Sequence, residues 1–208
     1  MGQNIELGQF NLSDQHIHRF RLFSFENLFS EKSYRALQHS FNEVSWEKKE
    51  TFFYTQFKSH ILPAQKHAIA SLFDPAFFFP FKAKLEQHVG VSFQNYIRIH
   101  AHKLITEDEI GVHNDYSDPE MGCENFRFVF QFSQPNQLSS GGEITFLSSR
   151  YKDDLIKQYS YGSNMGICFE ITPYSFHYVT AVQGERHTLV MYLWEEGRKR
   201  NESGVEIL

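Results

Sequence analysis

The sequence contains few cysteines, no long apolar run and no excess of positive charge. Its two cysteines, Cys123 and Cys168, are too few for a disulfide scaffold or a zinc cluster, so we expect both thiols to be reduced. The densest apolar run, residues 75–81, is far too short to cross a bilayer, and residues 1–15 lack an apolar stretch of signal-peptide length. These absences predict a soluble, cytoplasmic protein.

The formal net charge of −5 argues against a generally basic surface. Nucleic acids and anionic membranes attract such a surface, so we expect neither as a partner. A length of 208 residues fits one domain and is enough to bury a sizeable core. The composition leaves the oligomeric state open.

The first part of the chain has the periodicity of helices. Apolar residues at helical spacing predict helices over residues 29–43, 63–73 and 77–89. Ser30 is suited to cap the first of these helices, and Gly90 to end the last. Residues 46–60 fit a helix or a strand equally well. We therefore expect residues 1–90 to form a mainly helical support region.

From residue 91 the hydrophobic pattern changes to a period of two, which is typical of strands. The expected strands lie within residues 91–105, 124–133, 141–149, 162–171 and 186–194. Helices followed by short strands predict an α+β domain with a sandwich or barrel of antiparallel strands. No linker separates the two parts, so we expect one domain over residues 1–208, with a β core at 91–195 and a charged tail at 196–208.

His113 and Asp115 are the first candidates for metal ligands. In an extended chain, residues two positions apart point to the same face, so both side chains can grip one cation. His177, at the start of another strand-like run, can supply a third ligand. Two histidines and one carboxylate form the facial arrangement of non-haem Fe(II) oxygenases, which leaves positions open for other ligands. Taken alone, an H-x-D pair is more often surface polarity at a strand end.

Arg186 and Thr188 add a second element to this pattern. Arg186 follows His177 by nine positions and shares a strand face with Thr188. A guanidinium and a hydroxyl can therefore converge on one carboxylate. A buried arginine is costly unless it is paired, so an inward-pointing Arg186 implies an anionic partner. The alternative is an arginine at the rim that pairs with Glu185 or Glu195.

The order of these motifs, with Gly141-Gly142-Glu143 between them, resembles that of the Fe(II)/2-oxoglutarate-dependent oxygenases, most of all the prolyl-4-hydroxylase-like branch. The resemblance covers about residues 96–194. It implies a double-stranded β-helix, a jelly-roll or cupin-like barrel, flanked by N-terminal helices. It also implies that Fe(II) is held by His113, Asp115 and His177, and that the distal carboxylate of 2-oxoglutarate is bound by Arg186 with Thr188.

Weaker correspondences concern Tyr96, Arg127 and Gln131, which we expect to contact the co-substrate or the substrate. One position departs from the family pattern, because Asp108 stands where a glycine is usual. The implied reaction consumes O2 and 2-oxoglutarate, with ascorbate as a supporting reductant, and releases succinate and CO2. It hydroxylates an unactivated C–H bond of a small-molecule or peptide substrate: an amino acid, a peptidyl residue or a small natural product.

The sequence suggests two other interpretations, of which the first is set aside and the second is kept as the alternative. His100, His102 and Glu107 approximate a cupin-type metal motif, but the glycines that flank that motif are missing, so two same-face histidines near a barrel mouth are the simpler interpretation. The chain could also be a non-catalytic metal- or ligand-binding β-barrel module. Acidic residues in loops 102–112 and 116–125 fit either an amine-bearing substrate or a solvated rim.

Overall fold

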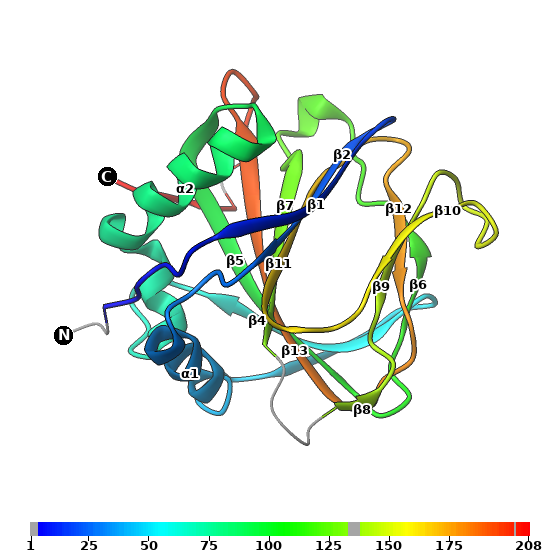
Figure 1. The fold of residues 1–208 in the computed structure, drawn as a ribbon, viewed down its shortest axis with the longest axis horizontal. Coiled ribbons are helices and arrows are strands. Elements are labelled where there is room, and N and C mark those ends of the chain that lie inside the picture. Colours follow the sequence, from blue (N-terminus) through cyan, green and yellow to red (C-terminus); the bar gives the residue numbers. More distant parts are fainter. Residues whose placement is uncertain (1–3, 133–137, 202) are drawn as a thin grey trace.

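The computed structural model describes residues 4–132, 138–201 and 203–208, and their strands form two antiparallel sheets (Figure 1). The larger sheet has ten strands, in the order β1-β2-β11-β7-β13-β5-β4-β3, with β14 added to β5 and β8 to β13. The smaller sheet has four, in the order β10-β9-β12-β6. Figure 1 shows the smaller sheet facing the larger one. The α+β class with packed antiparallel strands, which the sequence predicts, is therefore confirmed.

The strands of the larger sheet are β1 (Asn11–Ile17), β2 (Arg21–Glu26), β3 (Glu47–Glu50), β4 (Thr55–Ile61), β5 (Phe93–Ile105), β7 (Phe126–Phe132), β8 (Leu138–Ser140), β11 (Ser163–Glu170), β13 (Gln183–Glu195) and β14 (Val205–Glu206). Those of the smaller sheet are β6 (Ile110–His113), β9 (Ile144–Leu147), β10 (Leu155–Tyr159) and β12 (Phe176–Val179). The helices are α1 (Glu31–Ser40), α2 (Pro75–Val89) and the 3-10 helices η1 (Ala68–Phe73) and η2 (Pro119–Met121).

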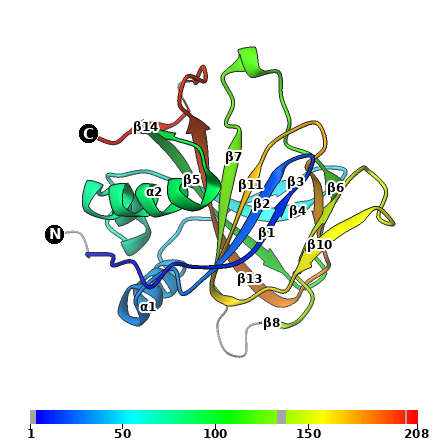
Figure 2. The ribbon, with the colours of Figure 1, turned by 45° about the horizontal axis from the view of Figure 1, so that its top comes forward.

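Strand β7 separates two hydrophobic cores. Its residues Phe126, Phe128, Phe130 and Phe132 are buried on the face that packs against α1 and α2. Val129, on the opposite face, belongs to the core between the two sheets. The alternation read from the sequence thus places the helices on the outer face of the larger sheet, as Figure 2 also shows.

The local helix signals of the first part are confirmed. The Ser30 hydroxyl accepts a hydrogen bond from the Ser33 backbone N–H and caps α1. Helix α2 ends at Gly90, whose φ of 74° is favourable for glycine. The helix expected over 63–73 is shorter, because only Ala68–Phe73 is helical, as a 3-10 helix.

The first part is nevertheless mixed rather than mainly helical, which corrects the expectation for residues 1–90. Strands β1 to β4 all lie within it, and residues 46–60, which fitted either pattern, form β3 and β4. The C-terminal residues also differ from a simple charged tail, because β14 pairs with β5 and Ile207 is buried in the outer core. β3 is entirely charged, and β1 and β4 have only isolated apolar residues among polar ones, so their hydrophobic pattern does not predict a strand.

In the described part of the chain, no helix combines the length and the apolar character needed to cross a membrane. The cytoplasmic location stays a prediction.

Candidate metal centre

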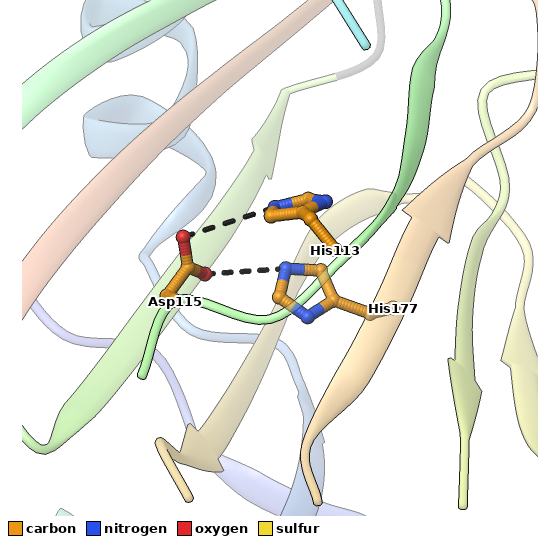
Figure 3. Close-up of side chains that lie close together, drawn as sticks. All are labelled: His113, Asp115 and His177. Atoms are coloured by element: carbon orange, nitrogen blue, oxygen red, sulfur yellow. Dashed lines mark ion pairs between the residues drawn. The ribbon is translucent and has the colours of Figure 1, made fainter. Parts of the chain in front are cut away.

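His113, Asp115 and His177 meet at the edge of the smaller sheet (Figure 3). His113 is the last residue of β6, Asp115 follows it by two positions, and His177 lies on β12. Because β12 pairs with β6 in antiparallel register, His177 stands opposite His113. One potential ligand atom from each residue lies within 4.8 Å of the others. The structure thus brings together all three predicted metal ligands.

Both histidines are oriented by backbone carbonyls. The Nδ1 atom of His113 lies 2.9 Å from the Gly111 oxygen, and the Nδ1 atom of His177 lies 3.0 Å from the Ser175 oxygen. A ring nitrogen bonded to a carbonyl must carry the proton, which leaves Nε2 with a free lone pair. Burial lowers the pKa of His177 to about 3, so this imidazole is neutral at physiological pH.

Asp115 lies between the two imidazoles and an arginine. Its Oδ1 is 3.8 Å from His113 Nε2, and its Oδ2 is 3.4 Å from His177 Nε2 and also forms an ion pair with Arg127 Nη1. Burial alone would raise the pKa of Asp115, but the charge of Arg127, followed by the interactions with His177 and His113, lowers it below the usual value. The carboxylate is therefore ionised over the physiological range and suited to a cation.

Arg127 belongs to a charged network beside the triad. Its Nη2 lies 2.8 Å from Glu124 Oε1, while the other oxygen of Glu124 lies 3.0 Å from Arg98 Nη2. The guanidinium carbon of Arg127 stands 4.9 Å from the ring centroid of Tyr192. Arg127, a weak prediction from sequence, thus contacts a metal-ligand candidate and borders the same cavity.

Arg186 is buried on β13, with 4% of its surface exposed. Its Nε donates to the Gly142 carbonyl oxygen at 3.0 Å, and its guanidinium carbon lies 5.1 Å from the ring centroid of Tyr161. Among the described residues, no carboxylate lies within ion-pair distance of this guanidinium. Burial lowers the pKa of Arg186 to about 10, so the side chain remains cationic at neutral pH. Thr188, two residues on, is also buried.

A cavity of about 190 Å³ connects the triad to Arg186 and Thr188. Sequence reasoning missed the part of its wall that β4 and the preceding segment provide. These residues are Phe53, Tyr54, Gln56 and Lys58. Their role depends on the pairing of β4 with β5, and the ambiguous pattern of residues 46–60 gave no signal for that pairing.

Two of the weaker predictions do not reach this cavity. The Tyr96 hydroxyl donates to the Asn201 carbonyl and accepts from the Gly204 N–H, each at 2.6 Å. Tyr96 shares a face of β5 with His102, which does line the cavity, but lies six residues away, roughly 20 Å along a strand. Gln131 lies opposite Thr188, and its Oε1 instead accepts from the Gly162 N–H at 2.8 Å.

The cupin-type alternative gains no support from the geometry. His113, Asp115 and His177 are the only group of three metal-type ligands found in the part of the chain that is described. His100 Nδ1 lies 2.9 Å from the Tyr192 hydroxyl, and Glu107 is exposed. The structure therefore has the simpler arrangement, two histidines on the same face of one strand.

The glycine pair before β9 shapes the Arg186 end of the cavity. Gly141 and Gly142 have φ values of 78° and 75°, a region that favours glycine. The Gly142 carbonyl accepts the hydrogen bond from Arg186, and a Cβ on Gly141 would lie 1.8 Å from the Ala181 oxygen. Gly141 must therefore be small for the turn to pack against Ala181, and both residues adopt a backbone conformation that favours glycine.

We expect Gly141→Ala to lower the free energy of unfolding by at least about 2 kcal/mol, because left-handed backbone costs a non-glycine residue about 1–2 kcal/mol and the clash adds to it. Gly90→Ala is the matched control, with a φ of 74° and nothing within 4 Å of the added Cβ. Urea unfolding of both variants would measure the difference. Equal losses would contradict the role given to the close approach.

No family model and no curated protein matches this sequence. Solved structures do match its fold. A prolyl-4-hydroxylase from Pseudomonas putida has 13% identity and a TM-score of 0.65, with 86% of this chain and 93% of that one covered. A 2OG-Fe(II) oxygenase family oxidoreductase from Burkholderia pseudomallei has 15% identity and a TM-score of 0.64, with 84% of each chain covered.

A third structure is a prolyl hydroxylase from Trichoplax adhaerens, in complex with a hypoxia inducible factor oxygen degradation domain peptide fragment. It has 10% identity and a TM-score of 0.66, with 84% of each chain covered. The chain therefore has the fold of the prolyl-4-hydroxylase and 2OG-Fe(II) oxygenase structures. The resemblance read from the sequence is confirmed at the level of the fold.

Proposed function

We propose that this protein is an Fe(II)- and 2-oxoglutarate-dependent oxygenase that hydroxylates an unactivated C–H bond. The substrate is an amino acid, a peptidyl residue or a small natural product, and succinate and CO2 are released. The observation that carries the proposal is a buried, carboxylate-free Arg186 in the same cavity as a two-histidine, one-carboxylate triad. The triad fits Fe(II), and the Arg186 end of the cavity fits 2-oxoglutarate.

The triad fits Fe(II). Two imidazoles held at Nδ1 by backbone carbonyls present Nε2, and the ionised Asp115 presents a carboxylate, a ligand set that suits a non-haem Fe(II) and leaves coordination positions open. Arg127 fixes the second carboxylate oxygen and keeps Asp115 in place. Phe146 and Phe169 pack on His177, with ring centroids 5.5 and 5.0 Å away, and keep bulk water from this side of the ligand.

The other end of the cavity fits 2-oxoglutarate. A buried guanidinium without a carboxylate partner is costly, and a dicarboxylate removes that cost by pairing with it. Nε is held by Gly142, so the remaining N–H groups of Arg186 are left to form a fork for the co-substrate. Thr188 adds a hydroxyl on the same face of β13.

When bound, Fe(II) and 2-oxoglutarate supply the oxidising chemistry, with O2 as oxidant and ascorbate as supporting reductant. The protein's own residues bind and orient these reagents and restrict the entry of water. We further propose that the two facing sheets are a double-stranded β-helix and that residues 1–208 form one domain. The similarity in fold to the prolyl-4-hydroxylase structures supports this architecture.

The test is succinate release from the purified protein with Fe(II), 2-oxoglutarate, ascorbate and air. Separate panels of free amino acids, peptides and small metabolites should be supplied, and we expect one panel to stimulate release above the substrate-free rate. Omission of Fe(II) is the control and should remove the signal. Tight Fe(II) binding without 2-oxoglutarate consumption in any panel would favour the non-catalytic binding module instead.

A further inference from the structure

The cavity has more positive than negative side chains in its wall. Three cationic residues line it, Lys58, Arg127 and Arg186, against one carboxylate, that of Asp115. Arg127 is already paired with Asp115 and Glu124, and Arg186 is reserved for the co-substrate in the proposed function. Of the three cations, Lys58 is therefore the one that has no partner among the described residues and none in the proposed reaction.

The neighbours of Lys58 on its own sheet do not neutralise it. In the register of the sheet, Lys58 stands between Glu47 of β3 and His102 of β5. Glu47 forms an ion pair with Lys49 instead. Within the described residues, Nζ of Lys58 forms no ion pair and no hydrogen bond. His102 offers no negative charge, and its Nδ1 is already in contact with Gln56.

The charges that act on Lys58 also leave it without an ion-pair partner among the described residues. Burial lowers its pKa, and the repulsion from Arg98 and Arg127 acts in the same direction. Glu124 opposes this effect, but its two carboxylate oxygens are occupied by Arg127 and Arg98. A partly desolvated ammonium beside two guanidinium groups is stabilised by an added anion and destabilised by an added cation.

The largest charge repulsions on Lys58 come from Arg98 and Arg127 and not from Arg186. Arg98 and Arg127 both stand over Tyr192, at 4.1 and 4.9 Å from its ring centroid. Lys58 pairs with His102, and His102 pairs with Thr188, so two inter-strand spacings, roughly 10 Å, separate the backbone of Lys58 from that of Thr188. The dependence of 2-oxoglutarate affinity on Lys58 therefore distinguishes a second anion there from the one that Arg186 binds.

We propose, on the basis of the function proposed above, that the substrate carries a carboxylate and that Lys58 binds it. Phe53, Tyr54, Ile110 and Val179 also line the cavity and give the rest of the substrate an aromatic and aliphatic wall. This proposal disfavours an amine-bearing substrate, which the acidic loops had left open. Glu107 and Glu109 line a different hollow, beside Phe52, and are not among the residues that line the cavity.

The test measures binding without turnover. Wild-type protein is loaded anaerobically with Fe(II) and 2-oxoglutarate and titrated calorimetrically with matched compounds. One arm compares free amino acids with their amides, and the other compares capped peptides containing Asp or Glu with those containing Asn or Gln. We expect at least a tenfold preference for the carboxylate in one arm, which also identifies whether a small molecule or a peptide carries it. Lys58→Met should remove this preference, and Lys58→Arg should retain it.

Lys49→Met is the matched control, because Lys49 lies on the adjacent strand and is paired with Glu47; it should keep the wild-type preference. The affinity for 2-oxoglutarate should be unchanged in Lys58→Met, and a tenfold loss would place Lys58 in the co-substrate site and overturn the proposal. Wild-type protein that shows no carboxylate preference, or Lys58→Met that keeps it, would also overturn it. Failure of the proposed function itself would be visible separately, as wild-type protein that binds neither Fe(II) nor 2-oxoglutarate.

Discussion

Replacing Asp115 by alanine should abolish 2-oxoglutarate turnover and weaken Fe(II) binding by at least about 100-fold. Loss of a group that merely orients a metal ligand typically costs 10- to 100-fold in affinity, and Asp115 is placed as a ligand itself. The substitution also removes the only carboxylate among the described residues that line the cavity, which leaves a site with net positive charge facing a cation. Anaerobic titration with Fe(II) and the succinate assay measure the two effects.

The fold should survive this substitution, because Arg127 keeps its ion pair with Glu124 when Asp115 is removed. The melting temperature of the metal-free variant should therefore stay close to that of the metal-free wild type. Glu109→Ala, in the loop before β6, removes the same charge from an exposed position and serves as the control. Chelation of the wild type should reproduce the inactive state, and Fe(II) should reverse it. Full activity of Asp115→Ala would refute the assignment of the ligand.

The short-range part of the site could be predicted from the sequence because local geometry determines it. Two residues two positions apart on an extended segment share a face, and this property places His113 beside Asp115 and Arg186 beside Thr188. Local geometry alone could not predict the position of His177, because its approach to His113 depends on the register between β12 and β6. The family resemblance supplied that long-range information.

The same alternation could not predict how far along a strand a residue lies from the site. Tyr96 lies on the inner face of β5, as the period of two predicts, but at the end where the C-terminal residues pack. A period gives the face of a residue and not its distance from the site. That distance depends on which segments cover each end of the sheet. The segment that covers this end includes Asn201 and Gly204, and the sequence predicted only a charged tail there.

The N-terminal strands could not be predicted for a related reason. β3 is entirely charged and β4 mixes polar and apolar residues, so their sequence does not decide between helix and strand; the pairing of β3 with β4 and of β4 with β5 does. That pairing places Lys58 in the wall of the cavity. The residue that we propose for substrate recognition thus depends on a long-range contact with no local signal in the sequence.

Replacing Arg186 by methionine should raise the KM for 2-oxoglutarate by at least about 30-fold. Truncating one partner of a buried, hydrogen-bonded charge pair costs about 2–5 kcal/mol, and 2 kcal/mol corresponds to about 30-fold in affinity. Arg186→Lys should recover only part of this loss, because an ammonium keeps the charge but lacks the planar fork that holds a carboxylate through two parallel hydrogen bonds. Steady-state kinetics with varied 2-oxoglutarate measure both variants.

Fe(II) affinity separates this role from a structural one. Arg186 contacts Gly142 and Tyr161 and none of the three ligand candidates, so the Fe(II) dissociation constant of Arg186→Met should equal that of the wild type. Arg35→Met, on the exposed face of α1, removes an arginine without approaching the cavity and should leave the KM for 2-oxoglutarate unaltered. An unchanged KM in Arg186→Met would remove Arg186 from the co-substrate site. The buried guanidinium would then need another anion.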